Sequence, residues 1–206
     1  MSALMIWLGA AILYGAFRAW YDNWRGPLRA EEIDAYLERA RDTSMDEVND
    51  LAVIRKFLED DDGKEFVMLN LVRLHPKPVP HPETGELTRA RTLLQGYMAG
   101  FMPTLLRHGG IPLLQARKVG PYIDAWGAEP DPGWTLVGYM RYRSRRDMIQ
   151  LATDPRFVGS HGFKIAAISN TFSFPTQYGP RGLIGPRVWV AGALALIAAL
   201  AHLAIA

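Results

Sequence analysis

The chain has 206 residues, a formal net charge of +2 and no cysteine. So small a net charge gives no reason to expect nucleic acid as a partner, because nucleic-acid-binding domains concentrate Lys and Arg. The missing cysteine excludes disulfides, thiolate metal sites and a cysteine nucleophile. With 49% hydrophobic and 21% charged residues, the composition favours a folded domain between the ends rather than a disordered linker.

The first element is an apolar segment that runs from Ala3 to Phe17. If the long side chain of Arg18 reaches back to the membrane surface, the usable span extends to Trp20. We expect residues 1–24 to form a membrane-spanning helix. A cleaved signal peptide is the alternative, but such peptides begin with basic residues, and Met1 to Ile6 has none. Aromatic residues typical of a membrane interface follow: Trp20, Tyr21 and Trp24.

Two helices are predicted between residues 25 and 63. The first runs from Ala30 to Arg41, and its apolar side chains recur at helical spacing. The second runs from Ser44 to Asp60, and Ser44 with Glu47 matches a capping box. We expect the pair to form a neck that joins the membrane to the domain. The alternative is that both helices pack on the surface of the domain.

A nearly continuous apolar run, Phe66 to Val72, predicts a strand that is buried on both faces. Side chains alternate along a strand, so its residues divide into two rows. One row is Val67, Leu69 and Leu71, and the other is Phe66, Met68, Asn70 and Val72. The proline-rich stretch 75–82 and the residues to Glu86 then predict a loop.

The remaining pattern predicts a helix, two strands, a helical segment in two parts and a last strand. The helix covers Thr88 to His108 and stops at Gly109-Gly110, with Pro103 as a kink or a restart. The later elements are strands at Ile111–Val119 and Trp134–Arg143, a helix from Ser144 capped with Asp147, a helical piece at Pro155–Ile168 and a strand at Thr171–Phe174. This β-α-β-β-α-β order over residues 64–176 is the ferredoxin-like arrangement.

After a linker at residues 177–187, a second apolar segment runs from Val188 to Ala206. As a helix it would be about 28 Å long, close to the thickness of a hydrocarbon core. Small residues recur four positions apart in both segments: Ala11 and Gly15, and Ala191, Ala195 and Ala199. This spacing lets helices pack closely. The alternative is that Ala and Gly are simply common in such helices.

Arginines beside both segments lie on the side of the domain: Arg18, Arg25, Arg29, Arg181 and Arg187. By the positive-inside rule, the domain faces the cytoplasm and both termini lie on the opposite side. The cluster of Arg143, Arg145 and Arg146 is interpreted as a solvated face, with contact to anionic lipid headgroups as the alternative.

Several short motifs together resemble an uncharacterised branch of the dimeric α+β barrel superfamily. They are Phe66-Val67-Met68-Leu69-Asn70-Leu71-Val72-Arg73, Tyr97, Arg107-His108-Gly109-Gly110, Tyr139-Met140-Arg141-Tyr142-Arg143-Ser144 and Asp154-Pro155-Arg156-Phe157. The resemblance implies a homodimer in which one sheet face packs on the helices and the other faces the partner's sheet. Its members include cofactor-free monooxygenases, isomerases, and haem-degrading and haem-binding enzymes, so it does not choose the reaction.

Candidate pocket residues come from both central strands. Asn70 is a polar group in a buried row, so its amide must be paired with protein, water or ligand. Tyr139 and Arg141 share one face of their strand and are candidates to share a cavity with Asn70. An inward Arg141 would bind a carboxylate, phosphate or haem propionate, and the alternatives are an inter-subunit salt bridge or simple exposure.

Tyr97, His108 and His161 complete the candidate set. A haem ligand or a general base would need an imidazole in a cleft. His108 is more simply a cation at the end of a helix, where it interacts with the helix dipole. His161 lies on a predicted helix between Phe157 and Ile165, so its side chain is expected to face inward.

Strong catalytic signatures are missing, since the sequence has no P-loop, dinucleotide fingerprint, zinc-protease motif or nucleophile elbow. No cofactor is predicted.

The first hypothesis is a membrane-anchored binding or accessory protein that docks with another membrane protein. The second is a cofactor-free monooxygenase or isomerase that acts on an apolar, membrane-partitioning substrate. The third is haem binding through His108 or His161.

Overall fold

The computed structural model describes residues 2–43, 49–179 and 185–205. The chain divides into two compact units, of which one combines Met1–Trp24 with Tyr178–Ala206 and the other comprises Arg25–Gln177.

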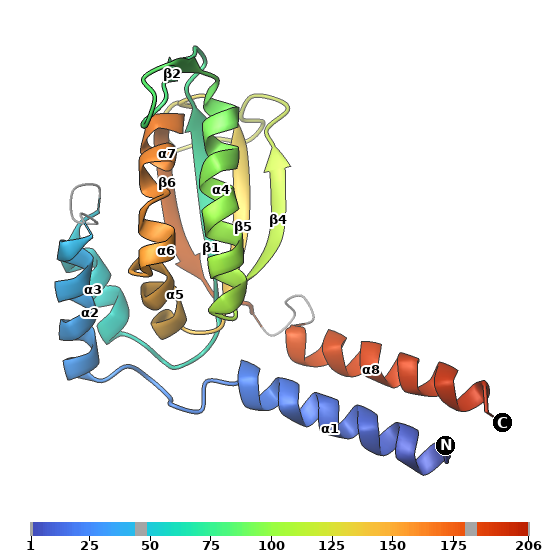
Figure 1. Ribbon diagram of the computed structural model, residues 1–206. Coiled ribbons are helices and arrows are strands. Elements are labelled where there is room, and N and C mark those ends of the chain that lie inside the picture. The colour runs from blue at the N-terminus through green and yellow to red at the C-terminus, as the bar shows by residue number, and fades with distance from the viewer. Residues whose placement is uncertain (1, 44–48, 180–184, 206) are drawn as a thin grey trace. The chain divides into compact units, whose positions relative to one another are not determined.

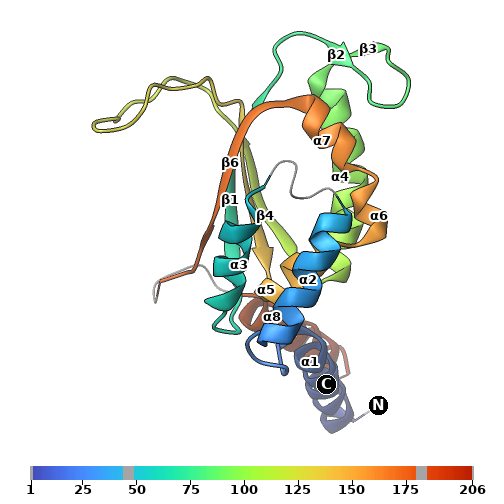
Figure 2. The same cartoon turned by 90° about the vertical axis from the view of Figure 1, so that its left-hand side faces the viewer.

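Two terminal helices form the first unit, α1 (Ala3–Tyr21) and α8 (Pro186–Leu203). They lie side by side and antiparallel (Figures 1 and 2). At one end the Trp7 indole donates to His202 Nδ1 at 3.3 Å, and at the other the Arg187 guanidinium donates to Asp22 at 2.7 Å. Both helices are long and apolar enough to cross a membrane by length and composition.

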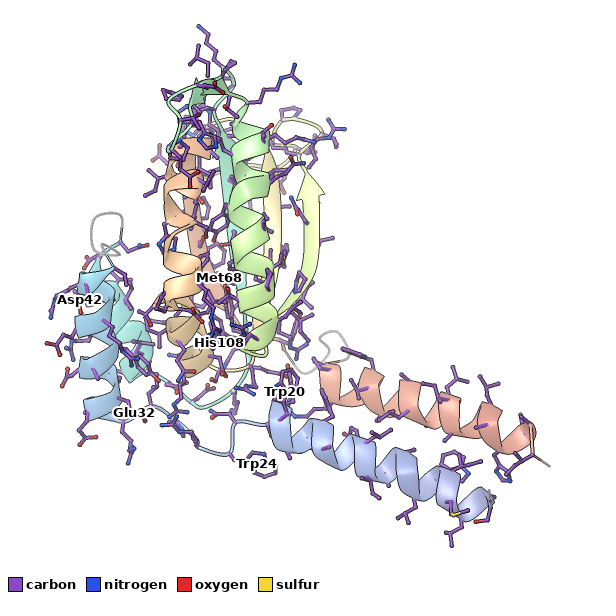
Figure 3. The ribbon with its side chains drawn as sticks, in the orientation of Figure 1. Trp20, Trp24, Glu32, Asp42, Met68 and His108 are labelled. Atoms are coloured by element: carbon purple, nitrogen blue, oxygen red, sulfur yellow. The ribbon has the colours of Figure 1, made fainter. Side chains whose placement is uncertain are left out.

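The small residues of the two helices only partly match the predicted packing face. Ile6 and Ala198 are buried, whereas Ala11, Gly15 and Ala195 are exposed. The predicted four-residue spacing therefore does not describe the contact between α1 and α8. Trp20 and Trp24 lie at the C-terminal end of α1 and are exposed (Figure 3).

The second unit begins with α2 (Ala30–Asp42) and α3 (Leu51–Glu59). The helix α2 matches its predicted range, but α3 begins later than predicted. Its N-cap is Asp50, whose carboxylate accepts a hydrogen bond from the Ala52 amide at 2.8 Å. The capping box predicted from Ser44 and Glu47 lies outside the described residues.

The helices α2 and α3 pack on α5 (Arg145–Ala152). This matches the predicted alternative in which both helices pack on the surface of the domain. Their shared cluster consists of Ile33, Tyr36, Leu37, Leu58, Ile149 and Ala152. Arg146 is 4% exposed and donates to Glu32 and to the carbonyl oxygens of Gly26 and Pro27. The predicted solvated arginine face is therefore wrong at Arg146, which joins α5 to α2.

A four-stranded antiparallel sheet forms the centre of this unit, in the order β4-β5-β1-β6. The strands are β1 (Phe66–Leu74), β4 (Ile111–Arg117), β5 (Leu136–Tyr142) and β6 (Ile168–Thr176). The helices α4 (Ala90–Arg107), α6 (Pro155–Val158) and α7 (His161–Ala167) cover one face (Figure 1). The predicted mixed α+β class with two apolar terminal helices is confirmed.

Some boundaries differ from the predicted ones. The proline-rich loop contains a short hairpin of β2 (Val79–Pro80) and β3 (Leu87–Thr88). Pro103 lies inside one continuous helix, so the alternative of a restart there is wrong. The predicted helical piece at Pro155–Ile168 is interrupted between α6 and α7, and Ile168 begins β6. The predicted cap is confirmed, because Ser144 Oγ accepts from the Asp147 amide at 3.1 Å.

The core lies between the sheet and the helices. Its buried members are Phe66, Tyr97, Phe101, Leu105, Met140, Tyr142, Leu151 and Phe157. Glycines let α4 approach the next helices closely, since a Cβ on Gly96 would lie 3.1 Å from the Phe163 ring and one on Gly100 would lie 3.1 Å from Ser160 Cβ. The helix α4 therefore packs closely against Ser160 and against Phe163 of α7.

Candidate functional site

The two rows of β1 face opposite sides of the sheet, as predicted. Phe66 and Met68 pack in the core, so the row that contains Asn70 faces the helices; we call this the covered face. Figure 3 shows Met68 on this strand. The opposite row contains Leu69 and Leu71, and we call its side the open face. Beyond Val67 all of β1 keeps some exposure, so the helices do not close the covered face completely.

Asn70 is held by the protein itself. Its Nδ2 donates to the carbonyl oxygens of Met68 at 3.1 Å and Gly138 at 3.3 Å. The Ser173 hydroxyl donates to its Oδ1 at 2.8 Å. Pairing with the protein, one of the alternatives from the sequence, therefore accounts for the Asn70 amide. The side chain links β1 to both neighbouring strands, β5 and β6.

Tyr97 projects from α4 into the aromatic core. Its ring stacks on Phe101 with centroids 5.5 Å apart and lies equally close to Phe157. Burial raises the pKa of the Tyr97 phenol well above its ordinary value, and Tyr142 adds to this effect. The phenol therefore stays protonated near neutral pH and is available as a hydrogen-bond donor.

His161 and Lys164 lie three residues apart on α7 and continue this cluster. The His161 ring meets the Phe157 ring edge-on at 4.5 Å, and Lys164 Nζ lies 5.7 Å from the centre of the Tyr97 ring. Burial lowers the pKa of His161, and the charge of Lys164 lowers it further. Burial also lowers the pKa of Lys164. A neutral imidazole, a phenol and an amine thus meet around one aromatic wall.

Sequence reasoning missed Lys164. The signal was its spacing from His161, because residues three apart on a helix share a face. The helix α7 has only seven residues, which is too short for hydrophobic periodicity to show which face is buried.

His108 forms the C-cap of α4, at the end of that helix (Figure 3). Its Nε2 lies 3.2 Å from the Asp154 carboxylate, an ion pair when the imidazole is protonated. The pair lines an open surface pocket of about 370 Å³ together with Arg39, Gln150 and Arg156. The structure therefore places His108 away from the cluster of Tyr97, His161 and Lys164, against α5 and α6.

The expectation that Tyr139 and Arg141 share a cavity with Asn70 is wrong. Tyr139 pairs with Leu69 and Arg141 pairs with Val67, so both side chains lie on the open face. Directly paired residues in an antiparallel ladder share a face, and Asn70 pairs with Gly138 instead. Arg141 is 2% exposed and forms an ion pair with Glu65 of the same chain, at 3.2 Å between Nε and Oε2.

The open face is mainly apolar. Val67 and Arg141 at one end of it are buried, whereas its outer strands are exposed. Phe172 and Phe174 of β6 are 46% and 42% exposed, and Leu114 of β4 is 53% exposed. The central residues of the face are Val67, Leu69, Leu71, Leu114, Ala116, Val137, Tyr139, Phe172 and Phe174. The loop between β4 and β5 extends away from the sheet (Figure 2) and exposes Val119, Ile123 and Trp126.

Comparison with known proteins identifies the fold but no activity. A protein of unknown function from Rhodopseudomonas palustris, RPA0582, is 22% identical with a TM-score of 0.53, over 64% of this chain and 95% of that chain. Methylated RPA0582 gives 22% identity and a TM-score of 0.55, over 66% and 96% of the two chains. No family model and no curated protein matches the chain. The chain shares a mixed α+β fold with these two structures.

Proposed function

We propose that this chain is a membrane-tethered homodimer of ferredoxin-like domains, which serves as a binding or accessory subunit at the cytoplasmic face of a membrane. The observation that carries the proposal is the open face. It is a row of apolar side chains across all four strands, with two half-exposed phenylalanines. Antiparallel sheets that face water on one side normally present polar residues there.

A second copy of the chain is the occupant that fits this face. The centre of the face carries a single charged side chain, Arg141, and this is already paired with Glu65. An apolar surface without unpaired charge is complementary to itself, as a two-fold interface requires. Two sheets pack face to face with interdigitated side chains about 10 Å apart. The strand order β4-β5-β1-β6 supports the ferredoxin-like assignment, and the paired sheets would form the barrel that the sequence resemblance implies.

The terminal helices support the membrane tether. Both pass the length and hydropathy requirements, and Arg18 and Arg187 lie at the ends that carry the interfacial Trp20. Lys and Arg are enriched in cytoplasmic segments next to membrane helices. This distribution supports a cytoplasmic domain with both termini on the other side.

A second candidate function is a cofactor-free monooxygenase or isomerase that acts on an apolar substrate from the membrane. The cluster of Tyr97, His161 and Lys164 favours it, since it combines a proton donor, a neutral base and a cation beside an aromatic wall. No comparable observation favours haem. Nε2 of His108 is engaged by Asp154, and the His161 ring is packed against Phe157.

Cysteine cross-linking tests the dimer, because the natural chain contains no cysteine. Tyr139→Cys places a single thiol near the centre of the open face, and Met68→Cys places the matched control on the covered face. We expect oxidation of isolated membranes to give a disulfide-linked dimer with Tyr139→Cys and not with Met68→Cys. Equal cross-linking of both variants, or none with Tyr139→Cys, would contradict pairing through the open face.

A reporter fused after Ala206 tests the sidedness. We expect activity from a reporter that works only outside the cytoplasm and none from one that works only inside it. The reverse result would overturn the arrangement of two spanning helices with a cytoplasmic domain.

A further inference from the structure

The loop between β4 and β5, residues 118–135, is anchored at its base, and we call it the arm. Lys118 forms an ion pair with Asp131 across the base. The Trp134 indole is 8% exposed and donates to the Tyr122 hydroxyl at 2.8 Å. These contacts fix both ends of the arm to the sheet, so its direction is set by the fold.

The rest of the arm carries large apolar side chains that touch little of their own chain. Val119, Ile123 and Trp126 are 85%, 92% and 86% exposed. Single exposed apolar residues are ordinary on a protein surface, whereas a group of them marks a contact surface. Three nearly complete exposures on one loop therefore indicate that the arm packs against another molecule.

The arm points to the side of the open face. In Figure 2 it leaves the sheet in the direction opposite to α4 and α7. At its base the Trp134 ring meets the ring of Phe172, a residue of the open face, edge-on at 5.1 Å. The surface of the arm is therefore continuous with the open face.

The arm is long enough to pass a second sheet. About eight residues lead out from β4 and about eight lead back to β5, so the arm reaches at most ~25 Å. Two sheets that pack face to face lie only about 10 Å apart. A sheet stacked on the open face would thus lie within reach of the arm.

The charges of the arm favour a protein over a lipid as its partner. Asp124 and Glu129 lie on the arm beside its apolar residues, and both are exposed. A hydrocarbon core penalises carboxylates, and anionic headgroups repel them. The polar rim of a protein interface keeps such groups in water.

We propose that the arm clasps a second copy of this chain, with Ile123 and Trp126 packed on that copy beyond the rim of the paired open faces. Two-fold symmetry makes the contact reciprocal, so each dimer has two such arms. The inference rests on the proposed dimer and adds a separate contact to it.

Photocross-linking of the full chain in isolated membranes tests where the arm lies. The probe is p-benzoylphenylalanine in place of Trp126, and the matched control carries it in place of Leu87, which is 74% exposed on β3. We expect irradiation to give a covalent dimer from position 126 and none from position 87. An adduct of position 126 with lipid or with another protein, no adduct, or equal dimer yields from both positions would overturn the proposal.

Trp126→Ser gives a second measurement. It should raise the dissociation constant of the dimer about tenfold, because a buried tryptophan often dominates an interface. Förster transfer between labelled copies in a detergent concentration series measures this, and Leu87→Ser should leave the constant unchanged. The thermal unfolding of dilute Trp126→Ser should match that of the natural chain, because the side chain is exposed.

An unchanged dissociation constant in Trp126→Ser would overturn the contact. The disulfide of Tyr139→Cys reports pairing of the open faces separately. If that disulfide forms and position 126 gives no adduct with a second copy, the arm contact alone is wrong. If the disulfide does not form, the proposed dimer is wrong and the clasp with it.

Discussion

The two faces of the sheet are both largely apolar, but helices cover only one of them. The covered face packs Phe66, Met68, Met140 and Tyr142 against the helices and also carries Asn70. The open face carries aliphatic and aromatic side chains, of which Phe172, Phe174 and Leu114 are exposed. An antiparallel sheet that has one face toward water normally presents polar residues on that face.

This arrangement has two physical consequences. An apolar face without cover exposes surface that water disfavours, so it favours association with a second sheet. Polar groups under helices must find partners, and Asn70 finds them in Met68, Gly138 and Ser173. The open face is therefore the better candidate for a subunit interface.

The contrast between the faces predicts very different costs of truncating a leucine. Leu105 of α4 is fully buried in the core, and Leu114 on the open face is 53% exposed. We expect Leu105→Ala to lower the free energy of unfolding by about 2–5 kcal/mol, because it removes buried methyl groups and leaves a cavity. Denaturant unfolding of the full chain in detergent, followed by near-UV circular dichroism, measures this cost.

Leu114→Ala is the matched variant for the open face. In dilute protein that is mainly monomeric, it should cost less than about 1 kcal/mol, because an exposed leucine contributes little to folding. Its effect should instead appear as weaker dimerisation in a concentration series. A cost equal to that of Leu105→Ala at low concentration would mean that the open face is covered within one chain.

Acid should loosen the contact between α2 and α5, where Glu32 pairs with Arg146. Burial opposes ionisation of Glu32, but the hydrogen bond from Arg146 outweighs it and, with the Arg29 amide and Arg25, lowers the pKa of Glu32 to about 2 from 4.5. The folded state therefore binds this proton less tightly than the unfolded state. The resulting stability is fully present above about pH 4.5 and is lost as the pH falls toward 2.

Comparing the natural chain with Glu32→Gln separates the stability contributed by this ion pair from that of the other carboxylates. We expect the natural chain to lose about 1–3 kcal/mol more stability than Glu32→Gln between neutral pH and the acid range, measured by thermal unfolding at each pH. Parallel pH profiles for the natural chain and Glu32→Gln would show that Glu32 does not hold α2 on α5.

Much of the fold could be predicted from local patterns. The division of β1 into two rows, the cap at Ser144 and the range of α2 follow from periodicity and capping chemistry, which involve residues close in sequence. The late start of α3 and the interruption before α7 were missed, since turns and caps over a few residues compete closely with continued helix.

The candidate site was predicted only in part. Three of the predicted residues lie on the covered side of the sheet: Asn70, Tyr97 and His161. This agrees with their prediction as a polar residue in a buried row of β1 and as residues on the inward faces of helices. Tyr139 and Arg141 were grouped with Asn70 wrongly, because alternation gives two equivalent rows on each strand. Only the register, Asn70 with Gly138, decides which rows share a face.

The sequence by itself determined the two apolar helices, the mixed α+β class and the absence of cysteine chemistry, since these depend on composition and on short-range periodicity. Tertiary structure alone decided that Arg146 would be buried against Glu32, that Arg141 would pair with Glu65, and that Lys164 would meet Tyr97. These contacts join residues far apart in the chain. Their existence depends on how whole elements pack, a choice that no local pattern encodes.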